Sequence, residues 1–317
     1  MVNLLKSNIV KSNKEKLQQE LEETFLIDKY RNEERKLRLK PIKDDREAFD
    51  KLLGNSVSDF VVGSNITINY LFFVDEIRKM SISIDELNKA IERLEIIDIF
   101  VEDDENPQLI FESLNSTGLD LSEADKIRNF ILMRLDNKKQ EDFYERYWNQ
   151  IEKLTCLNGE KEYKVSEFIR HYLTLITKRI PNINDVYFIF KNYVIKQIQE
   201  GMASDCENIL QDMLKYAKIY NKIINSSFVS NRICKILKRL NHIDMTVIYP
   251  FFLAFFEMFD EDKITEDEAI KVLNCIESFI FRRMICPGYA TNALNKIFST
   301  LHYDVEKNLD TGYSYSS

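Results

Sequence analysis

Glycine and proline are scarce in this chain, which has 7 Gly and 5 Pro among 317 residues. Both residue types mark turns, and a many-stranded sheet needs frequent turns, so their scarcity favours long helices. Hydrophobic residues make up 44% of the chain, which is enough to bury one large or two ordinary helical cores. We therefore predict a predominantly α, multi-helical fold with at most two short strands.

Helical spacing of apolar residues begins close to the start of the chain. Leu17, Leu21 and Phe25 recur every four residues and predict an amphipathic helix that ends near Tyr30. Another helix is expected to begin at Ser83, where the Ser-x-x-Glu pattern is typical of a capping box. The same reasoning predicts three further helices, over residues 46–53, 66–80 and 107–115.

Two short segments have the pattern of strands. Leu37 and Leu39 alternate with basic residues before Pro41, which predicts a half-buried strand closed by a proline. Residues 95–101, EIIDIFV, are apolar and rich in isoleucine over the length of a strand. The acidic residues 102–105 that follow could bind a hard metal, but they are more simply a solvated turn that places negative charge ahead of the next helix.

Residues 111–129, FESLNSTGLDLSEADKIRN, predict a helix, a tight turn and a second helix. Ser122 is expected to cap the second helix, with Asp125 returning a hydrogen bond to the cap. One interpretation is a well-capped turn in which Gly118 supplies a positive φ. The other is an anion site, because exposed amides at a helix start can hold negative charge. The residue pattern by itself favours the capped turn.

Everything beyond residue 137 is predicted to be helical, and we place a domain boundary near that residue. Breaks in the helical pattern are expected at five places, which are residues 157–159, Pro181, Gly201, Pro250 and residues 287–288. The longest apolar run, residues 247–256, contains a proline and is too short to span a membrane. No apolar leader is present, and five cysteines without a CxxC pair suit a reducing compartment, so we expect a cytoplasmic protein.

No complete set of catalytic residues is recognisable. The phosphate-binding GxxxxGK[ST] pattern, the zinc-binding HExxH pattern, GxSxG and GxGxxG are all missing from the sequence. His171, His242 and His302 lie far apart among apolar residues, and each is more simply a packed or surface histidine than a catalytic group. No metal ligands are predicted. Arg282 and Arg283 are candidates for phosphate contact, although salt bridges explain them equally well.

The formal net charge of −8 excludes a surface that is basic everywhere. Contact with DNA is therefore expected only through local basic patches. No membrane contact is expected, and the oligomeric state stays open.

The segment FESLNSTGLDLSEADKIRNFILM, residues 111–133, resembles a helical motif of GmrSD-type modification-dependent restriction endonucleases. The likeness is specific over residues 90–135 and weaker over residues 36–49 and 277–298. In that family a ParB-like domain carries an Asp-Gly-Gln-Gln-Arg motif tied to nucleotide hydrolysis, and an HNH nuclease domain follows. Neither motif occurs here, so the resemblance implies the middle of such a protein or a truncated relative.

The resemblance also implies an organisation and a candidate site. Residues 1–136 would be the second half of the ParB-like nucleotide-binding domain, with both short strands left from its α+β sheet, and residues 137–317 an all-helical spacer. NTP and Mg are implied for the intact family protein, with none expected in this chain. Phe111 and Leu121 match the family motif, and the residues that it places near the nucleotide are Asn115, Ser116, Thr117, Gly118, Asp125, Arg128 and Asn129.

Two functions from different classes follow. The first is a non-catalytic part of an NTP-dependent, DNA-targeting restriction or antiphage nuclease, in which the helices couple a nucleotide site to a nuclease domain. Its partners would be the missing ParB-like half and the HNH nuclease domain. The alternative is a stand-alone helical module that binds another protein and has no enzymatic activity.

Overall fold

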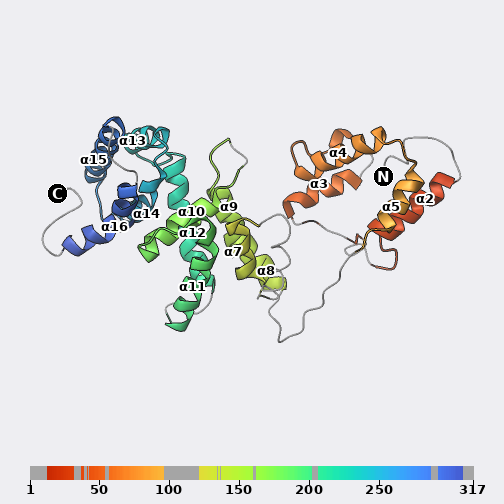
Figure 1. The fold of residues 1–317 in the computed structure, drawn as a ribbon, viewed down its shortest axis with the longest axis horizontal. Helices are drawn as coiled ribbons and strands as arrows, with labels where there is room; N and C mark the ends of the chain where they lie inside the picture. Colours follow the sequence, from red (N-terminus) through yellow and green to blue (C-terminus); the bar gives the residue numbers. More distant parts are fainter. Residues whose placement is uncertain are drawn as a thin grey trace. The chain divides into compact units, whose positions relative to one another are not determined.

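The structure is a computed structural model that describes residues 13–31, 37–38, 41, 43–53, 57–95, 121–133, 135, 137–159, 162–201, 206–286 and 292–309. The chain divides into two compact units, Met1–Phe100 and Val101–Ser317, which are considered separately. Within the described residues every named element is a helix (Figure 1), which confirms the predominantly α, multi-helical prediction. None of these helices is both long and apolar enough to cross a membrane.

The first unit contains four α-helices with two short helical turns. They are α2 (Asn13–Leu21), the π turn η1 (Glu22–Leu26), α3 (Lys43–Leu53), the 3-10 turn η3 (Val57–Asp59), α4 (Asn65–Lys79) and α5 (Ile84–Glu92). The predicted helices over residues 46–53 and 66–80 are confirmed as α3 and α4, which pack on each other. Ser83 and Glu86 form both hydrogen bonds of the predicted capping box at the start of α5.

The strand predicted around Leu37 is reduced to a single antiparallel bridge between Leu37 and Ile27. The Arg38 amide donates to the Leu26 carbonyl (3.0 Å), and the Arg38 guanidinium donates to the Glu23 carbonyl at the end of the first helix. Leu37 thus pairs with a helix end rather than with another strand, and no ladder forms there. Apart from Glu95, the second predicted strand lies outside the described residues, as does the predicted helix over residues 107–115.

The second unit is built from helices throughout. In chain order they are α7 (Glu123–Leu132), α8 (Asn137–Phe143), the π turn η4 (Tyr144–Trp148), α9 (Asn149–Leu154), α10 (Val165–Thr177), the 3-10 turn η5 (Ile183–Asp185), α11 (Val186–Gln199), α12 (Cys206–Ile224), α13 (Asn231–His242), the 3-10 turn η6 (Thr246–Ile248), α14 (Tyr249–Asp260), α15 (Glu266–Ile285) and α16 (Asn292–Leu309).

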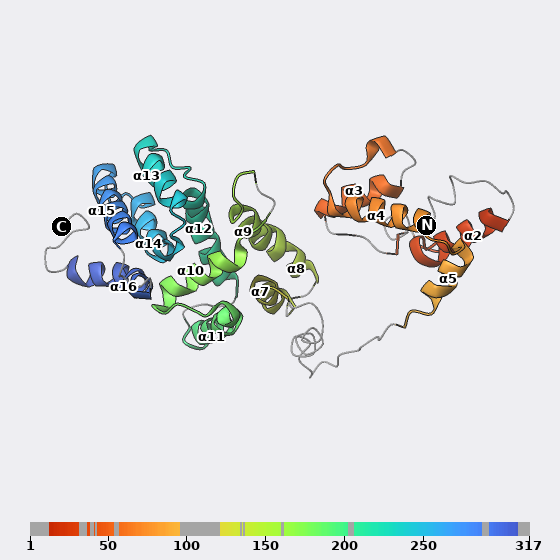
Figure 2. The ribbon, with the colours of Figure 1, turned by 45° about the horizontal axis from the view of Figure 1, so that its top comes forward.

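Helix α14 is the centre of this unit. Each of its residues from Tyr249 to Phe256 is buried, and α10, α12 and α16 all pack against it (Figure 2). Its sequence, YPFFLAFF, is apolar on all sides, and a helix of that kind has to be enclosed by other elements. Pro250 lies in the first turn of α14, where a backbone N–H would have no helical partner, so the proline does not weaken the helix. The break predicted at Pro250 is therefore the start of α14.

Several helices of the second unit end without glycine. Ser226, Asp244 and Asp262 have positive φ angles and follow the ends of α12, α13 and α14, and none of the three is among the breaks predicted from the sequence. Asn241 holds the first of these ends in place, because its side-chain amide donates to the carbonyls of Ile223 (2.9 Å) and of the next residue. A side chain from a neighbouring helix thus donates the hydrogen bonds to the last carbonyls of α12 that a glycine-containing turn often provides.

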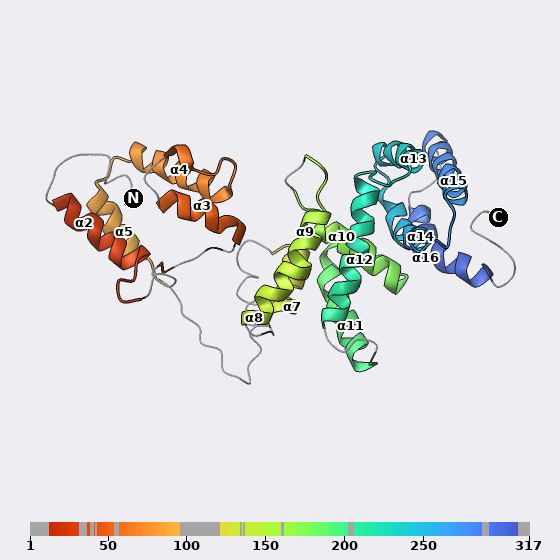
Figure 3. The same cartoon turned by 180° about the vertical axis from the view of Figure 1, so that it is seen from behind.

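Helix α7 belongs to the second unit. Its buried side chains Ala124, Ile127, Phe130 and Ile131 join the core of that unit, and α7 packs against α10 and α11 (Figure 3). The predicted boundary near residue 137 would have assigned α7 to the preceding domain, whereas the two units divide between Phe100 and Val101. The polar residues that follow residue 136 form helix α8, which belongs to the same unit as α7.

The enclosure of α14 leads to a stability prediction. Phe252 is fully buried, and we expect Phe252→Ala to lower the free energy of unfolding by about 3–5 kcal/mol, because it removes buried apolar surface and leaves a cavity. Phe279 on α15 is 41% exposed, so Phe279→Ala is a matched control with an expected loss well below that. Urea unfolding followed by circular dichroism measures both, and equal losses would contradict a core centred on α14.

Candidate functional site

The start of α7 carries the described part of the family-like motif. Ser122 caps the helix, because its hydroxyl oxygen accepts a hydrogen bond from the Asp125 amide (3.1 Å). The hydroxyl in turn donates to the Asp125 carboxylate (2.6 Å). The predicted return bond is therefore present, but it reaches the Ser122 hydroxyl rather than its backbone N–H.

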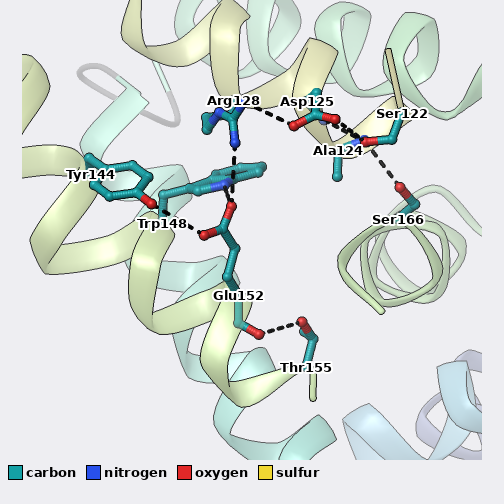
Figure 4. Close-up of polar contacts among 9 residues, drawn as sticks. All are labelled: Ser122, Ala124, Asp125, Arg128, Tyr144, Trp148, Glu152, Thr155 and Ser166. Atoms are coloured by element: carbon teal, nitrogen blue, oxygen red, sulfur yellow. Dashed lines mark hydrogen bonds and ion pairs between the residues drawn. The ribbon is translucent and has the colours of Figure 1, made fainter. Parts of the chain in front are cut away.

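Arg128 stands one turn further along α7 and lies between two carboxylates. It pairs with Asp125 on its own helix (2.9 Å) and with Glu152 on α9 (3.6 Å), as Figure 4 shows. About two thirds of the Arg128 side chain is shielded from solvent. Two of the predicted site residues, Asp125 and Arg128, thus belong to one polar network, and Glu152, which has no recognisable sequence signal, completes it.

Glu152 also holds a buried tryptophan. The Trp148 indole N–H donates to one Glu152 carboxylate oxygen (2.7 Å), and the Tyr144 hydroxyl lies 3.5 Å from the other (Figure 4). Trp148 is only 1% exposed, so the indole N–H has to find its partner inside the protein.

The π turn η4 makes this alignment possible. Tyr144 and Glu152 are eight residues apart, and in a regular α-helix they would point roughly 80° away from each other. A π turn acts as a one-residue insertion, so it reduces that angle to about 20°. The irregular turn between α8 and α9 therefore places both side chains on the face that meets α7.

Of the other predicted site residues, the three that the structure describes do not join this network. Asn129 is half-buried on α7, and its backbone carbonyl accepts the helical bond from Met133. Arg282 and Arg283 lie in the last turn of α15, where the negative end of the helix dipole favours cations. The rest of the predicted set, Asn115, Ser116, Thr117 and Gly118, lies outside the described residues.

A cleft of about 900 Å³ opens beside this network, where α7, α10 and α11 all begin. Its walls include Ser122 and Glu123 from the start of α7 and Asp244 from the turn after α13. The start of α10 contributes Lys164, Ser166, Glu167, Arg170 and His171. A smaller cavity of about 380 Å³ shares Ser122 and Lys164 with the cleft and reaches Asp125 and Glu152. The polar network and the cleft are therefore neighbours around the start of α7.

Two hydrogen bonds attach the start of α7 to the other walls of the cleft. The Ala124 amide donates to the Ser166 hydroxyl of α10 (3.2 Å; Figure 4). The Glu123 carboxylate accepts from the Tyr187 amide at the start of α11 (2.7 Å) and pairs with Lys126 (2.9 Å). The positive end of a helix dipole favours an anion, and at the start of α11 the Glu123 carboxylate provides it.

His171 forms part of the cleft wall and is only 7% exposed. Its ring packs against Tyr220 and Tyr249, with centroids 6.2 and 5.3 Å away. Burial, assisted by the charge of Arg170, lowers the pKa of His171 to about 3, so the ring is neutral at physiological pH. The prediction of a packed histidine is confirmed, but sequence reasoning missed that this ring also borders a cleft.

Chemically, the arrangement offers polar and charged groups for binding. Among the described residues, no group of three or more His, Cys, Asp or Glu side chains is placed to hold a metal ion. Comparisons of the chain with family models, with curated proteins and with solved structures found no match. Interpretation of the site therefore depends on its own geometry.

The Glu152 contacts lead to a second prediction. Glu152→Ala leaves the buried Trp148 N–H and Arg128 without their shared acceptor, and we expect a loss of about 1–3 kcal/mol in the free energy of unfolding. Glu152→Gln keeps an acceptor oxygen and should lose less. The exposed Glu141 on α8 provides the matched control, Glu141→Ala. Urea unfolding measures all three, and an unchanged Glu152→Ala variant would show that the network contributes nothing to stability.

The neutral His171 leads to a third prediction. Its ordinary pKa is 6.5 and its folded pKa is about 3, so below about pH 6.5 the unfolded chain binds a proton that the folded chain does not. The free energy of unfolding should therefore decrease as the pH is lowered below about 6.5, and this group contributes up to about 1.4 kcal/mol per pH unit. Urea unfolding near neutral pH and at about pH 5 should show a shallower pH dependence for His171→Gln. Parallel pH profiles for the two proteins would rule out this role.

Proposed function

We propose that this chain is a non-catalytic helical scaffold of an NTP-dependent, DNA-targeting restriction or antiphage nuclease, in which it couples a nucleotide site to a nuclease domain. The observation that carries the proposal is the Arg128 network. Arg128 and Asp125, two charged residues of the family-like motif, pair with each other, and Arg128 also pairs with Glu152. Ion pairs of this kind hold helices together. That is the role of a coupling element rather than of a catalytic centre.

The packing of α7 supports the same function. Its start is bound to α10 through Ser166 and to α11 through Tyr187, and its middle is bound to α9 through Glu152. A displacement at the start of α7 would therefore act on three helices at once. Such a connection lets a change at one end of a helical unit reach the other end. A nucleotide bound beside the motif in the intact protein would act on α7 in this way, with Mg as its counter-ion.

A second function has one observation in its favour. Ile68, Leu71 and Phe72 follow helical spacing on α4, and each is between 46% and 57% exposed. Large apolar side chains on one helix face are typical of surfaces that bind other proteins. The chain would then be a stand-alone module that binds another protein. In that case, nucleotide hydrolysis by a complex that contains the chain would not depend on Arg128.

The scaffold function is tested by phosphate release from ATP, GTP and UTP in the presence of Mg²⁺. We expect none from this chain alone, and hydrolysis when it is combined with a family domain that carries the Asp-Gly-Gln-Gln-Arg motif. In the combined protein Arg128→Gln should reduce hydrolysis, because it breaks the link between α7 and α9, whereas Lys235→Gln on the exposed side of α13 should not.

Hydrolysis by the isolated chain would contradict a non-catalytic role. Hydrolysis in the combined protein that is the same with and without Arg128 would instead favour the interaction module.

A further inference from the structure

The start of α10 is an uncapped helix end that faces the 900 Å³ cleft. Its N-cap residue is Lys164, whose side chain makes no capping hydrogen bond. Among the described residues, none accepts a hydrogen bond from the amides of Val165, Ser166 and Glu167, the first three of the helix. These amides and the helix dipole together favour a bound anion. The start of α11, by contrast, already receives the Glu123 carboxylate.

Two cations border the cleft without a carboxylate partner. Within the described part of the chain, neither Lys164 nor Arg170 forms an ion pair, and Arg170 uses only its Nε, which donates to the Pro181 carbonyl (2.8 Å). The remaining N–H groups of the guanidinium match the spacing of oxygens in a phosphate or carboxylate. Cations at a helix start are opposed by the helix dipole, so an anion between them would relieve that repulsion.

His171 gives a second, independent observation that favours a ligand in this cleft. It is more than nine-tenths buried and lines the cleft, yet no described residue donates a hydrogen bond to its ring or accepts one from it. A neutral imidazole has one N–H donor and one acceptor nitrogen, and neither has a partner within the described part of the protein. An oxygen of a bound anion could accept a hydrogen bond from the ring N–H.

We infer that this cleft binds a phosphate group, either as free phosphate or as part of a small phosphorylated molecule. The phosphate lies at the start of α10, where Lys164, Arg170 and the free amides surround it. Asp244 and Glu167 also border the cleft, and their carboxylates accept hydrogen bonds from hydroxyl groups of a larger ligand. The volume of about 900 Å³ is ample for a molecule the size of a sugar phosphate. The cleft would bind this ligand whether or not the chain acts as a nuclease scaffold.

The test follows the histidine side chains by NMR while inorganic phosphate is added at constant ionic strength, with chloride as the exchanged anion. The chain has 3 histidines, so their signals are easily separated. We expect the His171 signals to shift and saturate, while those of His242 and His302 stay in place. Binding that leaves the His171 signals unchanged would overturn the inference, as would a titration without saturation.

Substitutions of Lys164 test whether this side chain contributes to phosphate affinity. Lys164→Gln should weaken phosphate binding about tenfold, because it removes one charge-assisted contact, and Lys164→Arg should restore most of it. The matched control is Lys235→Gln, which removes the same charge from an exposed position on α13 that does not border the cleft. Equal weakening by Lys164→Gln and Lys235→Gln would mean that phosphate responds only to net charge, and would overturn the inference.

A second titration with ribose 5-phosphate separates the two sources of the phosphate group. Tighter binding than inorganic phosphate, lost in Asp244→Asn, identifies a phosphorylated sugar or nucleotide as the ligand. If inorganic phosphate and ribose 5-phosphate bind equally, and Asp244→Asn binds each of them as tightly as the unchanged protein or more tightly, the ligand is free phosphate. Ribose without phosphate serves as the control, and equally tight binding of ribose would exclude a phosphate site.

Discussion

The burial of α14 is the constraint on which the rest of the second unit depends. An apolar helix of this kind is stable in water only when neighbours cover it on all sides, and α10, α12 and α16 provide that cover. Helix α10 packs on α14 through residues that include His171, and this residue and the first turn of α10 also form part of the cleft wall. The position of Lys164 and His171 is thus a consequence of packing around a helix that neither residue belongs to.

Polar contacts then determine how α7 joins this core. Its apolar face would allow several rotations against α10 and α11, but Glu123, Arg128 and the Ala124 amide each bind a different neighbouring element. The π turn before α9 is part of the same arrangement, because it turns Glu152 and Tyr144 toward α7. A local irregularity in one helix and an ion pair to another therefore act together, in keeping with the coupling role proposed for α7.

Sequence patterns predict the structure where the interaction itself is local. The caps at Ser83 and Ser122 and the spans of α3 and α4 depend on residues within a few positions of one another, so the sequence displays them directly. Other features escaped notice because their cause lies elsewhere in the chain. The end of α12 at Ser226 has no glycine and relies on Asn241 of the following helix. Residues 137–143 are mostly polar and read as a linker, although they form helix α8.

Propensity, capping and hydrophobic period act over short distances, so the residues alone predict that this protein is helical and where several of its helices begin. The approach of Arg128 to Glu152, and of Lys164, His171 and Asp244 to one cleft, depends on the fold. These residues come from separate elements, and their proximity results from long-range packing, which no short stretch of sequence records.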